Sequence, residues 1–209
     1  MDVRFGNKSQ EAAIREEYRR IDEKWLKMQC QLMLFLMVFT VAAEVFMYFA
    51  LRALRVEFAS AGVYFTKYVL VPLVIDGGLW LGARRALHSG MTNRKKAYTV
   101  SFLMVAMAFV VYTMHSVFPA VFAVFIIPML VTVIYGDRKL TRGVAVACFL
   151  EKIVSDLFIF WDPARPSVLQ SADSTVNFGL SLVLLLIFYG ICTVMLLAEK
   201  EKNDAAIHL

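Results

Sequence analysis

Six ionisable side chains stand inside long apolar stretches of this sequence, where a charge is costly unless it meets a partner. They are four carboxylates, one amine and one imidazole: Glu44, Asp76, Glu151, Asp156, Lys152 and His115. At membrane depth, carboxylates and imidazoles hold protons or cations, and a carboxylate also pairs with an amine. These residue types therefore predict recognition of a cation, a proton or a small amine-bearing ligand.

Three of these residues are expected at similar depths. At a rise of 1.5 Å per residue, Glu44, Lys152 and Asp156 fall about 10, 13 and 8 Å from the outer ends of their apolar stretches. Lys152 and Asp156 are also four residues apart, which places them one above the other on a helix. We expect an ion pair between these two, with Glu44 as a third member.

The other three residues have less obvious partners. Glu151 is turned by about 100° from its neighbour Lys152 on a helix. We expect Glu151 to share a proton with Asp76 or to contact His115. The alternative for the whole set is a group of interhelical polar contacts that only fix how the helices pack.

Small residues and prolines accompany the charges. Asp76 is followed by Gly77 and Gly78, which permit close approach of a neighbouring helix. Pro72 and Pro128 are expected to kink their helices, because proline lacks the backbone N–H that the helix would use. Such kinks free carbonyl oxygens toward a helix-bundle interior.

The apolar stretches that carry these residues predict an all-α, polytopic membrane protein with six transmembrane helices. Of the 209 residues, 60 % are hydrophobic and the mean hydropathy is +0.65, well above a soluble domain of this size. A span needs roughly 20 mostly apolar residues. The expected spans are Gln31–Leu51, Tyr64–Leu81, Tyr98–Met114, Pro119–Tyr135, Val144–Trp161 and Phe178–Leu197. A re-entrant third and fourth pair is the alternative, since only four residues separate those two.

Basic residues predict the orientation. Seventeen of the 22 Lys and Arg residues fall before the first span, after the second, after the fourth and in the tail. Four lie on the other side, and Lys152 lies within the fifth span. Because basic residues collect on the cytoplasmic side, both termini are expected in the cytoplasm. The net charge of +5 is thus an orientation signal and does not indicate nucleic-acid binding.

The chain divides into three parts on this basis. Residues 1–30 predict a cytoplasmic amphipathic helix leading into the first span, residues 31–197 the six-span domain, and residues 198–209 a cytoplasmic helical connector. The first helix has apolar residues at alternating spacings of four and three: Ile14, Tyr18, Ile21, Trp25 and Met28. That spacing is a heptad seam. A helix lying on the inner leaflet is an equal alternative.

Signatures of enzymes and prosthetic groups are missing from the sequence. It has no nucleophile elbow, phosphate-cradling glycine loop or HExxH motif, and no Cys/His cluster that suggests a metal site. We therefore expect no catalytic activity within this chain, no cofactor and no metal. The expected partners are the lipid bilayer and a small ligand or cation.

The stretch from His115 to Arg142, HSVFPAVFAVFIIPMLVTVIYGDRKLTR, resembles the central membrane region of the six-span input domains of bacterial diguanylate cyclases. The tail from Ala198 to Leu209 is similar to the connector that leads into the cyclase domain of such proteins. The resemblance implies a sensory input module of the bacterial cytoplasmic membrane, working as a homodimer. The cyclase domain with its GGDEF loop is not in this chain, so no cyclase activity is implied for it.

These observations together predict a regulatory membrane domain whose sixth helix relays a signal to a cytoplasmic output. The unbroken run from the sixth span into the charged tail favours this interpretation. The alternative is a small cation- or proton-coupled transporter or channel subunit that uses the same carboxylates. The two halves of the chain show no repeat, which weakens the transporter interpretation.

Overall fold

A computed structural model describes residues 3–53, 60–114 and 119–161, together with Leu186 and Gly190. The described chain is all-α, as predicted. Its elements in order are α1 (Val3–Ala53), α2 (Ala61–Phe65), the π-helical turn η1 (Thr66–Leu70), α3 (Val71–His88), α4 (Asn93–Met114), the 3₁₀ helix η2 (Pro119–Phe125), α5 (Ile126–Val133) and α6 (Arg138–Trp161).

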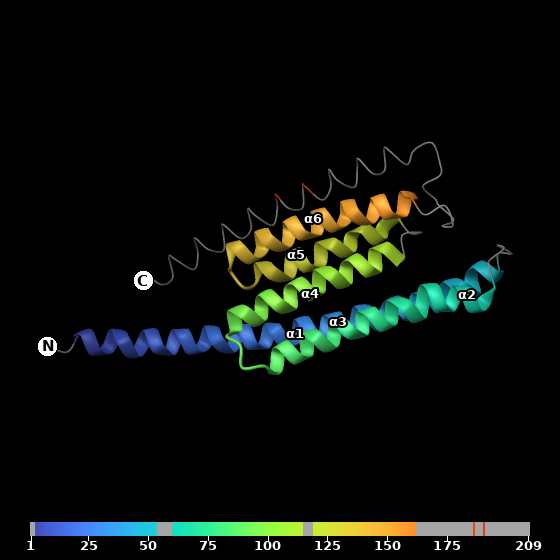
Figure 1. Ribbon diagram of the computed structural model, residues 1–209. Coiled ribbons are helices and arrows are strands. Elements are labelled where there is room, and N and C mark those ends of the chain that lie inside the picture. Colours follow the sequence, from blue (N-terminus) through green and yellow to red (C-terminus); the bar gives the residue numbers. More distant parts are fainter. Residues whose placement is uncertain (1–2, 54–59, 115–118, 162–185, 187–189, 191–209) are drawn as a thin grey trace.

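Helix α4 is the centre of the bundle (Figure 1). It packs against α1 and α3 on one side and against α5 and α6 on the other. Buried apolar residues accordingly surround α4, among them Val100, Met104, Met107 and Val111. A helix surrounded by other helices is apolar on every face because protein packs against it. A helix at the edge of the bundle is apolar on its outer face because lipid contacts that face. In the most apolar window of α4, 61 % of residues are buried, against 17 % in α1.

In the part of the chain that the structure describes, three helical segments are long and apolar enough to cross a membrane, which indicates a multi-pass membrane protein. They are Arg19–Phe49, Ala61–His88 and Asn93–Met114, and they contain or closely match the first three predicted spans. The fourth predicted span, Pro119–Tyr135, holds a shorter apolar helix, Ala123–Val133. The fifth lies within α6, and its three charged residues reduce its apolar character. The sixth lies outside the described residues except for two helical positions, Leu186 and Gly190.

The first helix is continuous from the N-terminal segment into the membrane region. At 51 residues, α1 is about 77 Å long. Its N-terminal part extends beyond the other described helices (Figure 1). A helix lying on the inner leaflet would have to bend where it joins the first span, and α1 has no break there. A continuous helix is compatible with the heptad interpretation of Ile14 to Met28, which stays a prediction.

Both prolines predicted to kink their helices stand next to a change of helix type. Pro72 is the second residue of α3 and follows the π-helical turn, in which Val71 N–H bonds back to the carbonyl of Thr66. Pro128 is the third residue of α5 and follows the 3₁₀ helix η2. Helical backbone precedes each proline, and a proline lacks the N–H group that would continue the intrahelical hydrogen bonds, an interruption that a π-helical or 3₁₀ turn can absorb. The change of helix type therefore accommodates each proline at low cost.

The two glycines after Asp76 were expected to permit close approach of a neighbouring helix, but none of the described helices packs tightly against them. A Cβ built on Gly77 would lie 3.9 Å from the Met37 sulfur, and one on Gly78 would meet nothing within 4 Å. The closer contacts are at Gly143, 3.4 Å from the Phe102 ring, and at Gly82, 3.5 Å from Leu103. The small residues that bring helices together are thus Gly82 and Gly143, which face side chains of α4.

The turn between α5 and α6 is specified by two consecutive residues. Gly136 has a φ of 59°, a left-handed conformation that favours glycine, and its N–H closes the end of α5 on the carbonyl of Val133 at 3.0 Å. The next residue, Asp137, caps α6. Its Oδ1 accepts the backbone N–H groups of Lys139 at 2.9 Å and Leu140 at 3.2 Å.

Candidate functional site

A buried ion pair lies on the face of α6 that packs against α4. The side chain of Lys152 is 1 % exposed and forms an ion pair with Oδ2 of Asp156, one turn further along α6. The other carboxylate oxygen, Oδ1, accepts a hydrogen bond from the hydroxyl of Tyr112 on α4. The ion pair predicted from the four-residue spacing is therefore present, and it has a phenol partner that was not predicted.

One aromatic ring lies next to the ammonium group of this pair, and a second ring packs behind it. The Nζ of Lys152 lies 5.0 Å from the centroid of the Tyr112 ring, a cation–π distance. The Phe125 ring packs against Tyr112 at 5.3 Å between centroids, and Phe125 is fully buried. Tyr112 thus contacts both charges, through its hydroxyl and through its face. We call Lys152, Asp156, Tyr112 and Phe125 the lysine cluster.

A hydroxyl pair adjoins the lysine cluster. Thr113 of α4 and Ser155 of α6 share a hydrogen bond at 2.5 Å, and both residues are buried. Each directly neighbours a member of the lysine cluster in sequence. Polar contacts in a low-dielectric region reinforce each other, and breaking one half of a buried ion pair typically costs about 3–5 kcal/mol. This region therefore fixes α6 against α4.

Glu44 belongs to a second polar cluster. It is 7 % exposed, and its Oε2 accepts a hydrogen bond from the Tyr64 hydroxyl of α2 at 2.7 Å. The Tyr64 ring lies 5.2 Å from Tyr48 and 5.1 Å from Tyr68, centroid to centroid. Glu44 was expected to join Lys152 and Asp156. The structure instead pairs it with Tyr64, whose ring belongs to a group of tyrosines near the end of α1.

Two predicted carboxyl groups contain an oxygen without a hydrogen-bond partner. These buried atoms are Oδ1 of Asp76 and Oε2 of Glu151, the two such side-chain atoms in the part of the chain that the structure describes. Asp76 is 1 % exposed and lies on the face of α3 that also buries Ala83 and Ala86. A buried carboxyl in this state is neutral or holds a ligand. His115, the other expected partner of Glu151, lies outside the described residues.

A polar network in the half of the bundle that holds the N-terminus of α4 was missed by sequence reasoning. Gln29 of α1 is fully buried; its amide nitrogen donates to Ser101 Oγ at 3.2 Å and lies 3.5 Å from Met104 Sδ. Its amide oxygen accepts the Tyr135 hydroxyl at 2.7 Å. Gln29 lies on the same face of α1 as the buried residues Leu26 and Met33. An amide at a position that the apolar pattern predicts to be buried was the signal that could have revealed this network.

The edge of the bundle at the N-terminus of α4 adds exposed polar links between helices. Arg94 Nε donates to Asp137 Oδ2 at 2.9 Å, and the Tyr98 hydroxyl donates to the same oxygen at 3.2 Å. Burial of the Asp137 carboxyl raises its pKa, but the Leu140 and Lys139 N–H groups and Arg94 outweigh this effect, so the pKa lies below its ordinary value. The N-termini of α4 and α6 are thereby held together.

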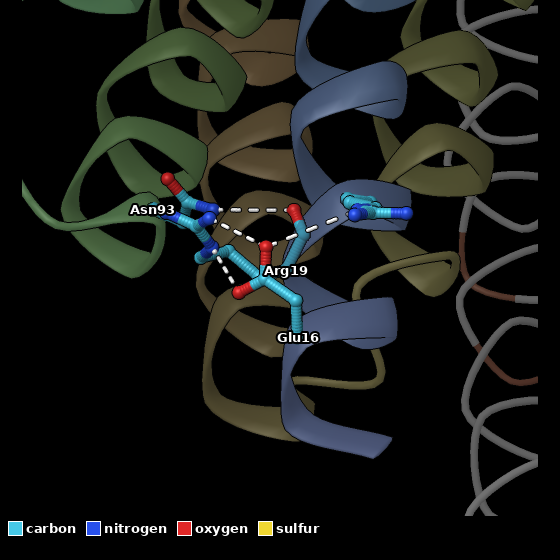
Figure 2. Close-up of polar contacts among 4 residues, drawn as sticks. Glu16, Arg19 and Asn93 are labelled. Carbon is cyan, nitrogen blue, oxygen red and sulfur yellow. Dashed lines mark hydrogen bonds and ion pairs between the residues drawn. The ribbon is translucent and has the colours of Figure 1, made fainter. Parts of the chain in front are cut away.

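A further exposed link joins α1 to α4 (Figure 2). The Asn93 side chain donates to the backbone carbonyl of Arg19 at 3.4 Å. Arg19 in turn forms a two-point ion pair with Glu16, at 2.6 and 2.9 Å. Hydrogen bonding to Arg19 lowers the pKa of the Glu16 carboxyl. This contact places Arg19 level with the start of α4 and marks this edge of the bundle on α1.

No arrangement for metal chemistry is found in residues 3–53, 60–114 and 119–161, where no group of three or more His, Cys, Asp or Glu residues is placed to hold a metal ion. What these clusters offer is a set of buried carboxyl, amine and phenol groups, the residue types with which proteins bind protons, cations or amines within a membrane. Comparison of the chain with protein-family models, curated proteins and solved structures finds no match.

Proposed function

We propose that this chain is a sensory input module of the bacterial cytoplasmic membrane, with six spans and both termini in the cytoplasm. It receives a signal in the membrane and passes it by helix movement to a cytoplasmic output such as a diguanylate cyclase, and it works as a homodimer. The resemblance of the stretch from His115 to Arg142 supports the class, and the distribution of Lys and Arg supports the orientation.

The observation that carries the proposal is the continuity of α1. One helix runs from Val3 to Ala53 without a break. Its buried face is attached to the bundle by Gln29, and its backbone at Arg19 accepts the contact from Asn93. A rigid helix that is held at membrane level and projects beyond the bundle transmits a shift at one end to the other. The sixth span and its charged tail are proposed to do the same at the other end of the chain.

The signal is proposed to be received by the polar clusters of the outer half. The lysine cluster joins α4 to α6, and the Glu44–Tyr64 contact joins α1 to α2. A proton, cation or amine that competes for Asp156 or Glu44 would loosen one of these joints. Such a ligand shifts a helix only by its difference in affinity between the two arrangements.

The second candidate is a cation- or proton-coupled transporter, which the buried oxygens of Asp76 and Glu151 favour. A carboxyl oxygen without a hydrogen-bond partner is ready to take up a proton or a cation. Flux measured in liposomes containing the purified protein, with Asp76→Asn as the comparison, separates the two functions. Flux that depends on Asp76 would support the transporter.

The test of the input-module proposal is a fusion of a cyclase reporter after Leu209. Each residue added to a helix rotates the downstream part of the chain by about 100°. Insertion of one or two residues after Lys202 should therefore disturb reporter output, and insertion of seven should largely restore it because a heptad nearly completes two turns. Output that ignores insertion length would show that the tail is only a tether and would contradict the proposal.

A further inference from the structure

The outward face of α1 carries a seven-residue repeat that continues from the membrane region into the cytoplasmic part of the helix. From Ile14 onward, apolar residues occupy every position at alternating spacings of four and three up to Phe49. We call these residues the α1 seam: Ile14, Tyr18, Ile21, Trp25, Met28, Leu32, Phe35, Phe39, Ala42, Phe46 and Phe49.

Between Ile21 and Phe49, seven of the nine seam residues are exposed, and the other two, Trp25 and Leu32, are half-buried, with Leu32 also packing against the core. Leu26, Met33 and Glu44 point into the bundle and are at most 7 % exposed. The seam residues two positions later, Met28, Phe35 and Phe46, are turned by about 200°. They are 37 %, 61 % and 70 % exposed. Helix α1 therefore has two opposite apolar faces, and its own chain covers one of them in the described part of the structure.

Lipid explains the outward apolar face only where the bilayer reaches. The outward apolar residues of α3 and α6 do not continue past the cytoplasmic edge of the bundle, because α3 ends at that edge and α6 begins there. The seam continues past that edge, which Asn93 marks at Arg19. Between positions 14 and 28, the apolar residues are the seam members and the buried Leu26, and the rest are charged or polar. Burying such an apolar stripe away from water lowers the free energy of the protein.

A strict heptad repeat also identifies the kind of partner. Over the five heptads from position 14 to position 49, a straight helix would let the stripe drift by roughly 100°. The stripe stays continuous only against another helix around which α1 supercoils. All copies of this chain insert in one orientation, so a second copy presents the same seam in parallel, and each residue meets its counterpart across a two-fold axis.

We propose that the α1 seam is the interface between two copies of this chain, paired as a parallel coiled coil that runs from the cytoplasm into the membrane. This inference rests on the homodimer of the proposed function and gives that dimer its surface. Apolar burial drives association in water, whereas lipid offers no such drive. The cytoplasmic end, Ile14 to Met28, therefore supplies most of the affinity, and the phenylalanines within the membrane set the register.

Disulfide cross-linking of the full-length protein in native membranes tests the surface. Single cysteines are placed at Ile21, Met28 or Phe35 after replacing Cys30, Cys148 and Cys192 by alanine. Matched controls are cysteines at Arg20 and Lys27, the neighbours of Ile21 and Met28 turned by about 100°, and at Val74, an exposed residue of α3. A disulfide forms when the two Cα atoms approach within about 7 Å. Covalent dimers are expected at the seam positions and at none of the controls.

The oligomeric state provides a second, independent measurement. The variant Ile21→Ala/Met28→Ala should raise the dimer dissociation constant by at least about tenfold, since it removes two apolar contacts from each copy. The variants Arg20→Ala/Lys27→Ala and Phe46→Ala/Phe49→Ala should change it less. Cross-links that form equally at the controls, or a dimer without seam cross-links, would overturn the α1 surface while leaving the proposed function standing. A monomeric wild-type protein would overturn both the surface and the dimer, whatever the reporter fusion shows.

Discussion

The hydroxyl of Tyr112 donates a hydrogen bond to Asp156, so that one aromatic side chain of α4 contacts both members of the buried charge pair on α6. The hydroxyl satisfies the carboxylate, and the ring lies next to the Lys152 ammonium. Buried charges persist when each has a partner and its remaining hydrogen-bonding groups are satisfied. The contribution of each group in this arrangement can be measured by removing it alone.

Tyr112→Phe should destabilise the protein through Asp156. The substitution keeps the ring and removes the donor, which leaves Oδ1 of the carboxylate without this hydrogen bond. Hydrogen bonds to charged groups contribute about 1.5–3 kcal/mol, so thermal unfolding in detergent should occur at a lower temperature. Tyr98→Phe is the matched control, because its carboxylate partner Asp137 also has backbone and arginine donors. Equal losses in both variants would contradict the buried role of Tyr112.

Lys152→Met should lower stability more than the double variant Lys152→Met/Asp156→Asn. The single substitution leaves Asp156 as a buried acid without its cation, which typically costs about 3–5 kcal/mol. The double substitution removes both charges, so much of this cost disappears. Melting temperatures of the two variants in the same detergent decide the matter. If they were the same, the ion pair would make no contribution.

The sequence was sufficient for the interactions that are local. Lys152 and Asp156 are one turn apart on one helix, so their spacing alone predicts the pair. The partners of Glu44 and Gln29 come from other helices, Tyr64 of α2 and Ser101 of α4, and hydropathy does not distinguish a neighbouring helix from lipid. For the same reason the apolar runs predicted where the first three spans lie but not that α4 is central.

Gln29→Ala should destabilise the contact between α1 and the rest of the bundle. It leaves the Tyr135 hydroxyl and the Ser101 hydroxyl without their shared partner. Each unsatisfied buried polar group costs about 1–3 kcal/mol. The control is Gln31→Ala, two residues further along the same helix and exposed, which should have little effect. A melting temperature unchanged by Gln29→Ala would show that the network carries no stability.

The contribution of the Asp137 charge should disappear in acid. Its folded pKa lies below the ordinary value of about 3.9, so the ionised carboxylate stabilises the fold at any pH above that value. As the pH falls below about 3.9 and through the lower folded pKa, this stabilisation is lost. The group is partly exposed, so the expected effect is small, on the order of 0.5–1 kcal/mol.

Asp137→Asn is the test of that charge, since asparagine still caps α6. Wild type should melt above the variant at pH 6, and the difference should shrink at pH 3. High salt should also reduce the difference at pH 6, because it screens the pair with the exposed Arg94. A difference that persists at pH 3 would mean that the cap geometry, and not the charge, distinguishes the two side chains.

The orientation predicted from basic residues can be tested at two exposed positions. Met91 lies between α3 and α4 and is 36 % exposed, and Ser60 precedes α2 at the opposite end of the same helical segment. On a background without native cysteines, Ser60→Cys should react with a membrane-impermeant maleimide added to intact cells. Met91→Cys should react only after permeabilisation, because the arginines and lysines around it hold that loop in the cytoplasm. Labelling of Met91→Cys from outside, with Ser60→Cys protected, would invert the topology and place both proposed cytoplasmic helices on the wrong side for an intracellular output.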